Sequence, residues 1–189
     1  MTSNAMVNLQ QPSAAAVAAV HEPSQYLTFT LGAEMFAIGI LHIKEIIEYG
    51  QLTAVPMMPG FIRGVINLRG AVVPVIDLAS RFGGTPSHIT RRTCIVIVEL
   101  QLGDGETRVL GVVVDAVSAV LDIASSDIEP APAFGTRIRT DFIAGMAKVN
   151  SRFVILLDVD RVLSMDEMAA LSGGIESSIG SAPAALLGS

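Results

Sequence analysis

Short apolar runs, each interrupted by turn-forming residues, recur along the chain from about residue 24 to residue 158. Runs such as AVVPVI (71–76) and VLGVVV (109–114) have the length of strands, whereas a membrane-spanning helix needs about 18 or more apolar residues. The GDGE stretch at 103–106 is a hairpin signal. We therefore predict a mostly β protein. The predicted strands are two within residues 25–40, then 52–55, 63–68, 71–77, 94–102, 107–115, 142–149 and 153–158.

Two segments have a pattern that is typical of helices. Residues 42–49 place isoleucine at positions i, i+3 and i+4, which suits a short helix with one apolar side. Residues 159–171 form the second segment, and Asp158 or Asp160 would cap a helix that begins there. The chain should therefore end its ordered part in a C-terminal helix.

The two halves of the chain are related by an internal repeat. FIRGVINLRGAVVPVIDL at residues 61–78 aligns without a gap with FIAGMAKVNSRFVILLDV at residues 142–159. Upstream, residues 36–47 align in the same way with residues 110–121. The matched pairs include Phe61 with Phe142, Ile62 with Ile143, Gly64 with Gly145 and Asp77 with Asp158.

The repeat predicts two small β-barrels, because short antiparallel strands at this spacing form barrels or sandwiches. A half of roughly 60 to 70 residues buries only a marginal core alone, so the halves should share an interface. We place the first barrel at about 24–86 and the second at about 92–158. The flanking segments 1–23 and 172–189, rich in Ala, Ser and Gly, are expected to be disordered tails.

Composition narrows the class of protein. The formal charge is −6, and no basic cluster is larger than Arg91-Arg92, so a nucleic-acid footprint is lacking. The single cysteine, Cys94, excludes an intramolecular disulfide and is compatible with a reducing cytoplasm. The first 20 residues contain no Lys or Arg, so we expect no signal peptide. A soluble cytoplasmic protein is the expectation.

Candidate catalytic and metal-binding residues are sparse. His21, His42 and His88 stand apart without any metal-ligand spacing, so we expect neither a metal nor a cofactor. Asp77 and Asp158 are repeat equivalents at strand ends, where two readings are open. They could come together as a carboxylate dyad, or each could cap the turn that follows it.

Arg69 lies between two apolar runs, next to Gly70. It could be an electrophilic catalyst, a plain turn residue, or an arginine whose ion pair orients an interaction surface. The aligned residue in the second half is Asn150, so the fold alone does not require arginine there. This asymmetry favours a functional role.

A run of motifs in family order closely resembles the CheW-type chemotaxis coupling proteins. The motifs are YLTFTLGAEMFAI, IKEII, VPMMPGFIRGVINLRG, VPVIDL, GVVVDAVSAVLDI and FIAGMA, and they extend over most of residues 24–171. The resemblance implies two five-stranded SH3-like β-barrels that share a hydrophobic core. It also implies a non-enzymatic, cytoplasmic adaptor in receptor arrays, which binds chemoreceptor cytoplasmic tips and the regulatory domain of the chemotaxis histidine kinase.

The resemblance also implies which residues contact partners. They are Ile43, Glu45, Ile46, Gly64, Arg69, Thr93, Cys94, Ile95, Val117 and Val120. We expect Glu45 and Arg69 to pair across the surface of the first barrel, and Ile43, Ile95, Val117 and Val120 to line a groove for a receptor helix; for the two valines a core role is the alternative. The chain departs from the family pattern in AIGILHI, where Gly39 stands in place of a frequent Asp. Two other functions stay open: a related coupler for a non-motility pathway, and a ligand-binding double barrel that uses Asp77 and Asp158.

Overall fold

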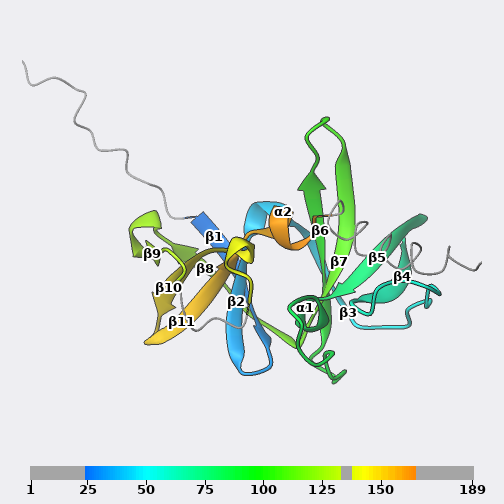
Figure 1. Cartoon of the computed structure of the whole chain (residues 1–189), viewed down its shortest axis with the longest axis horizontal. Coiled ribbons are helices and arrows are strands. Elements are labelled where there is room, and N and C mark those ends of the chain that lie inside the picture. Colours follow the sequence, from blue (N-terminus) through cyan, green and yellow to red (C-terminus); the bar gives the residue numbers. More distant parts are fainter. Residues whose placement is uncertain (1–23, 133–137, 165–189) are drawn as a thin grey trace, which may run out of the picture.

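The structure, a computed structural model, describes residues 24–132 and 138–164. It consists mostly of strands, which form two sheets that lie side by side (Figure 1). The predicted tails at 1–23 and 172–189, and the predicted helical residues 165–171, lie outside the described residues. Within the described part, no helix is both long enough and apolar enough to cross a membrane.

We call the five-stranded sheet the first subdomain and the six-stranded sheet the second subdomain. The first contains, in order across the sheet, β3 (Ile43–Glu48), β6 (Cys94–Gln101), β7 (Thr107–Val114), β5 (Ala71–Asp77) and β4 (Ile62–Leu68). The second contains β8 (Ala116–Ile123), β1 (Ser24–Leu31), β2 (Glu34–Gly39), β11 (Arg152–Leu157), β10 (Ile143–Val149) and β9 (Ile128–Glu129). The short helices are η2 (Ile40–His42), α1 (Leu78–Arg81), η3 (Ser125–Asp127), η4 (Thr140–Phe142) and α2 (Val159–Val162).

Each sheet is assembled from both halves of the chain. β5 pairs in parallel with β7 from the second half, and β11 pairs in parallel with β2 from the first half. β3 likewise pairs with β6, and β1 with β8. The predicted barrel boundaries at 24–86 and 92–158 are therefore wrong, because the halves exchange strands. The predicted fold class is confirmed, with the two-residue strand β9 added to the second subdomain.

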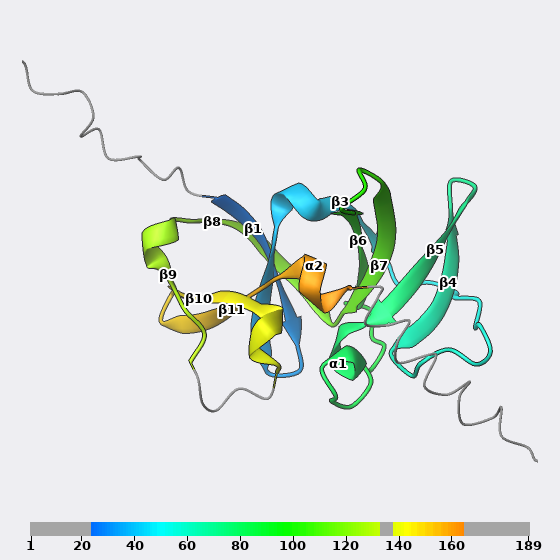
Figure 2. The same cartoon turned by 45° about the horizontal axis from the view of Figure 1, so that its top comes forward.

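The internal repeat is also seen in the structure, where bulges and strand register recur at aligned residues. The bulge between Ile62 and Gly64 recurs between Ile143 and Gly145. The exchanged strands also keep the same register, because Val75 faces Gly111 as the aligned Leu156 faces Ala37. The molecule is therefore a pseudo-symmetric pair of halves joined by two parallel strand pairs, β5 with β7 and β11 with β2, and two antiparallel ones, β3 with β6 and β1 with β8 (Figure 2).

Three apolar clusters explain why several strands are apolar at every position. In β6, Ile95 and Ile97 pack inside the first subdomain, whereas Val96 and Val98 point to a large core shared by both sheets. This follows from the two-residue alternation of a strand that is buried on both faces. The second subdomain has its own smaller cluster around Leu156. The predicted shared core is thus present.

The predicted helix at residues 42–49 is wrong. This segment is the strand β3, which pairs antiparallel with β6. Its isoleucines are β-branched and suit a pleated strand better than a helix. The spacing that suggested one helical face instead places Ile47 against the inner cluster and Ile46 on the outer surface. The strand predicted at 52–55 is reduced to one bridge between Thr53 and Val65.

Candidate functional site

Arg69 occupies a strained position in the hairpin between β4 and β5. Its φ is +52° and that of Gly70 is +87°, so both central residues of the turn have positive φ, as in a type I′ turn. The Asn67 side-chain oxygen accepts a hydrogen bond from the Gly70 N–H at 2.9 Å. In the second half, the aligned Asn150 has φ of +49°. Asn suits this backbone and Arg does not, at a cost of about 1 kcal/mol.

The guanidinium of Arg69 reaches back to β3. Its Nη2 donates to Glu45 Oε2 at 2.9 Å, which confirms the pair expected from the sequence. The Arg69 side chain is 78% exposed and that of Glu45 is 25% exposed. A solvent-exposed ion pair stabilises a fold by only about 0 to 1 kcal/mol. The strain and the pair roughly offset each other, so stability alone does not explain an arginine here.

Two of the predicted apolar contact residues are on the surface at repeat-equivalent positions. Ile46 on β3 is 43% exposed and Val120 on β8 is 49% exposed. Ile43 and Val117 are half-buried and pack against the shared core. Because successive side chains of a strand point to opposite faces, Ile46 lies on the face of β3 opposite to Glu45 and its ion pair. These residues can offer contact area to a partner.

The other predicted residues lie deeper. Ile95 is 1% exposed and packs inside the first subdomain, and Thr93 is buried with its hydroxyl accepting from Thr90 N–H at 2.8 Å. Cys94 is half-buried. Gly64 is buried in β4 with φ of +148°. Ile95, Thr93 and Gly64 therefore shape the surface from below and expose little of themselves.

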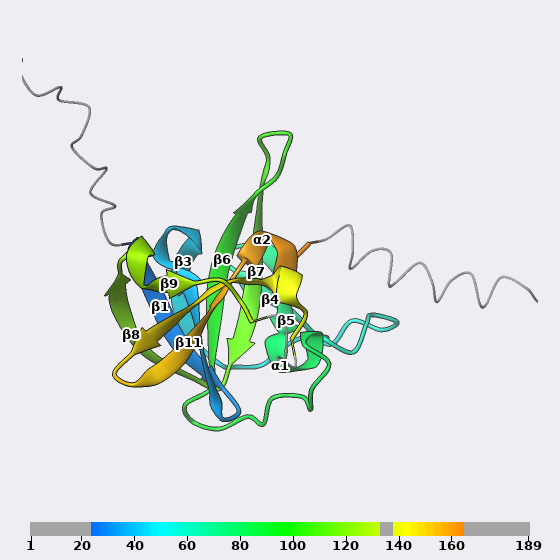
Figure 3. The ribbon, with the colours of Figure 1, turned by 60° about the vertical axis from the view of Figure 1, so that its left-hand side comes forward.

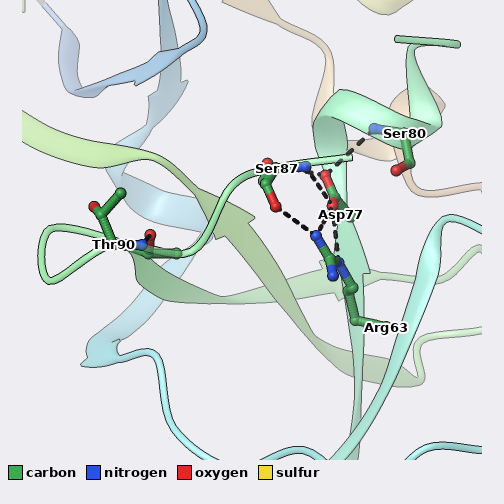
Figure 4. Close-up of polar contacts among 6 residues, drawn as sticks. Arg63, Asp77, Ser80, Ser87 and Thr90 are labelled. Atoms are coloured by element: carbon green, nitrogen blue, oxygen red, sulfur yellow. Dashed lines mark hydrogen bonds and ion pairs between the residues drawn. The ribbon is translucent and has the colours of Figure 1, made fainter. Parts of the chain in front are cut away.

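A buried polar cluster that the sequence did not reveal surrounds Asp77 (Figure 4). Asp77 is fully buried; its Oδ2 accepts from Arg63 Nε and from Ser87 N–H, both at 2.9 Å. Its Oδ1 accepts from the Ser87 hydroxyl at 3.0 Å and from Ser80 N–H at 3.3 Å. Arg63 also donates to the Ser87 carbonyl at 2.6 Å. The cluster ties the loop after α1 to the first subdomain.

The two repeat-equivalent aspartates have separate roles. Asp77 caps α1 through Ser80 N–H, and Asp158 caps α2 by accepting from Arg161 N–H at 3.2 Å. The bonds of Asp77 go to its own cluster, and Asp158 pairs with the Arg161 side chain at 3.6 Å. The capping reading is the one that the geometry supports, and the carboxylate dyad is not formed.

Metal-ligating side chains do not gather in the described ranges. Among residues 24–132 and 138–164, no group of three His, Cys, Asp or Glu side chains is placed to hold a metal ion. The expectation of no cofactor stays a prediction. The geometry instead offers an exposed ion pair at Glu45 and, on the opposite face of β3, the exposed apolar side chain of Ile46, and both are suited to contacts with another protein.

Comparison with known proteins places the chain among close relatives. A family model described as the CheW-like domain matches residues 25–167. The chemotaxis protein CheW of Klebsiella aerogenes is 40% identical over 145 residues, covering 77% of this chain and 84% of that protein. Protein FrzA of Myxococcus xanthus is 28% identical over 163 residues, covering 85% of this chain and 98% of that protein. The crystal structure of the scaffolding protein TtCheW from Thermoanaerobacter tengcongensis matches with a TM-score of 0.67 and 36% identity, covering 74% of this chain and 87% of that one.

Proposed function

Because this chain belongs to the family of CheW-like domains, we propose that it is a non-enzymatic adaptor that couples chemoreceptors to the chemotaxis histidine kinase. The family assignment makes it a chemotaxis scaffold protein. The partners that we propose are the cytoplasmic tip of a receptor and the regulatory domain of the kinase. Its place would be the cytoplasmic receptor array.

The observation that carries the proposal is the exposed pair of Arg69 and Glu45. Arg69 accepts an unfavourable backbone conformation to present its guanidinium at the end of the first subdomain. An exposed pair of this kind adds little to folding, but a partner that covers it removes it from water. Losing one member of a desolvated pair costs about 2 to 5 kcal/mol of binding, or roughly 30-fold or more in affinity.

The apolar residues would form a second part of the proposed contact surface, on the face of β3 opposite to Glu45. Ile46 and Val120 would contact a receptor helix directly, with Ile43 and Val117 behind them, in the manner of a helix in a groove. Cys94 would lie at the edge, while Thr93, Ile95 and Gly64 would support the groove from within. Joining two partners at once raises their effective concentration, so no chemical step is needed.

Replacing Arg69 with Asn tests the central pair. The second half carries Asn150 in the same turn, so the variant should fold with a melting temperature equal to or a few degrees above that of the parent chain. Binding to a receptor fragment or to the kinase regulatory domain should fall at least about 30-fold, measured by titration calorimetry. Arg161→Asn is the control, because Arg161 is another exposed arginine with a carboxylate partner. Unchanged affinity in a folded Arg69→Asn sample would contradict the proposed role.

Truncating Ile46 and Val120 to alanine tests the apolar surface. Both side chains are near half exposure, so the double variant should lose less than about 2 kcal/mol of unfolding free energy. Its binding to a receptor fragment should fall by about tenfold or more. Ile95→Ala should behave in the opposite way, losing about 2 to 5 kcal/mol of stability because Ile95 is buried. Equal receptor affinity of the parent and the double variant would remove these two residues from the contact surface.

A further inference from the structure

Arg81, the last residue of α1, connects the two subdomains through its buried side chain. The residue is only 9% exposed, and its Nε donates to the Val162 carbonyl of α2 at 3.1 Å. Its guanidinium lies 5.4 Å from the centre of the Phe61 ring and 4.7 Å from that of the Phe142 ring. Phe61 precedes β4 of the first subdomain, and Phe142 precedes β10 of the second. Arg81 therefore contacts both subdomains at the place where α1 and α2 meet (Figure 3).

The internal repeat shows where this contact lies in the molecule. Continued beyond residue 78, the alignment of the two halves places Val162 opposite Arg81, just as Phe142 aligns with Phe61. A residue that touches its own repeat equivalent must lie close to the axis that relates the two halves. A second arginine there would bring two like charges together in the interior, and the second half instead has the buried Val162. One arginine from the first half thus serves the junction of both.

Stability alone does not explain a buried arginine at this junction. Taking a guanidinium out of water is costly, and well-packed apolar residues that replace buried charged groups often leave a protein as stable as before. What the guanidinium adds is direction, because its N–H must point to the Val162 carbonyl while its plane faces an aromatic ring. Apolar side chains impose no such geometry. The contacts of Arg81 are therefore suited to fixing α1 relative to α2.

The proposed receptor surface depends on how the two subdomains are oriented. Ile46 lies on β3 of the first subdomain and Val120 lies on β8 of the second, so a rotation of one sheet against the other changes the distance between them. The Glu45–Arg69 pair, by contrast, lies wholly within the first subdomain. A receptor helix that contacts both Ile46 and Val120 would therefore bind only one orientation well.

We propose that Arg81 is a positioning residue, which fixes the orientation of the two subdomains so that one receptor helix can contact both. The orientation is a property of the chain alone, whereas its effect on binding rests on the adaptor function proposed above. Molecules in another orientation would not be competent to bind, and the apparent affinity falls with the competent fraction.

Electron paramagnetic resonance distances between two spin labels test the orientation on the full chain. The labels are attached at Val72→Cys on β5 and Phe153→Cys on β11, which are 70% and 60% exposed, in a background with Cys94→Ala. In Arg81→Met the mean distance should shift, or its distribution broaden, by about 2 Å or more. The urea midpoint should stay equal to that of the parent or rise. Arg161→Met, at an exposed arginine of α2, should match the parent in both measurements.

The same distances in Arg81→Met as in the parent would overturn the proposal, whether or not the variant is less stable. Arg81→Lys is the second variant, to be used also if Arg81→Met does not fold. It keeps a hydrogen-bond donor but loses the planar guanidinium, so it should broaden the distribution by a smaller amount. A parent-like distribution in the lysine variant of a chain that needs arginine to fold would likewise overturn the proposal.

Binding of a receptor fragment, measured by titration calorimetry, tests the consequence. The affinity of Arg81→Met should fall at least about fivefold, and that of Arg161→Met should stay unchanged. Altered distances with unchanged receptor affinity would overturn the positioning role. The distance measurement needs no partner, so a parent chain that binds no receptor would contradict the proposed function, while the spin labels still decide whether Arg81 fixes the orientation.

Discussion

Replacing Asp77 with alanine is expected to lower the free energy of unfolding by about 3 to 5 kcal/mol. The carboxylate is fully buried and accepts hydrogen bonds from Arg63, Ser80 and Ser87. Its removal leaves the Arg63 guanidinium, with only 26% of its side chain exposed, without its counter-charge. It also leaves the donors of Ser87 unsatisfied in the interior. Urea denaturation followed by far-ultraviolet circular dichroism measures the change.

The repeat supplies a matched control for this prediction. Asp158 caps α2 as Asp77 caps α1, but its side chain is 34% exposed and the residue aligned with Arg63 is Ala144. Asp158→Ala should therefore cost only about 1 kcal/mol, the usual loss for a helix cap. A loss of similar size at both positions would show that the buried cluster adds nothing beyond capping.

The Asp77 cluster also explains why Arg63 and Arg69 play different parts although both lie on β4 or its hairpin. Arg63 donates inward to a buried carboxylate and to the Ser87 carbonyl, whereas Arg69 points to an exposed partner. Neither arginine is repeated in the second half, where the aligned residues are Ala144 and Asn150. The repeat is therefore asymmetric at both positions, but the sequence analysis singled out only Arg69, and only the structure shows that Arg63 is an internal anchor and Arg69 a surface residue.

The repeat could be read from sequence because its key positions perform the same backbone task twice. Gly64 and Gly145 each follow a bulge, and Asp77 and Asp158 each cap a helix. Such local requirements restrict the residue type at each position, so the same residue recurs in both halves of the sequence. The Glu45–Arg69 pair was predictable for a related reason, since both residues belong to motifs that the family resemblance had already brought together.

The exchange of strands between the halves could not be predicted in the same way. Hydrophobic patterns identify strands and hairpins, but the pairing of β5 with β7 joins residues far apart in the sequence. An apolar strand with both faces buried fits a barrel built from one half of the chain as well as a sheet built from both halves. Likewise, the spacing of isoleucines in residues 43–48 is compatible with a helix, and it is the pairing with β6 that makes this segment a strand. The resemblance placed Thr93 and Ile95 in contact with partners, but Ile95 is in β6, which is buried on both faces, and Thr93 is buried in the turn before β6.

Replacing Gly64 with alanine is the second large effect that we expect. Gly64 has φ of +148°, which residues with a side chain rarely adopt, and an added Cβ would lie 2.4 Å from the Thr53 carbonyl oxygen. Thr53 bridges to Val65 through two backbone hydrogen bonds of 2.9 Å, so it cannot move aside without breaking them. We expect a loss of about 2 to 4 kcal/mol of unfolding free energy, measured by urea denaturation.

Two other glycines serve as controls for Gly64→Ala. Gly60→Ala should be close to neutral, because its added Cβ meets nothing within 4 Å. Gly145→Ala should cost less than Gly64→Ala, since the φ of Gly145 is outside the positive range and its Cβ would lie 3.0 Å from the Glu129 carbonyl oxygen, compared with 2.4 Å from the Thr53 oxygen at Gly64; its nearest contact, at 2.5 Å, is a methyl group of the Ile128 side chain. Gly64→Ala should also weaken partner binding, but only together with the loss of stability, because the glycine shapes β4 and the segment beside it. Arg69→Asn should weaken binding without that loss. A Gly64→Ala protein that is as stable as the parent and yet fails to bind would mean that the backbone at this glycine touches the partner itself.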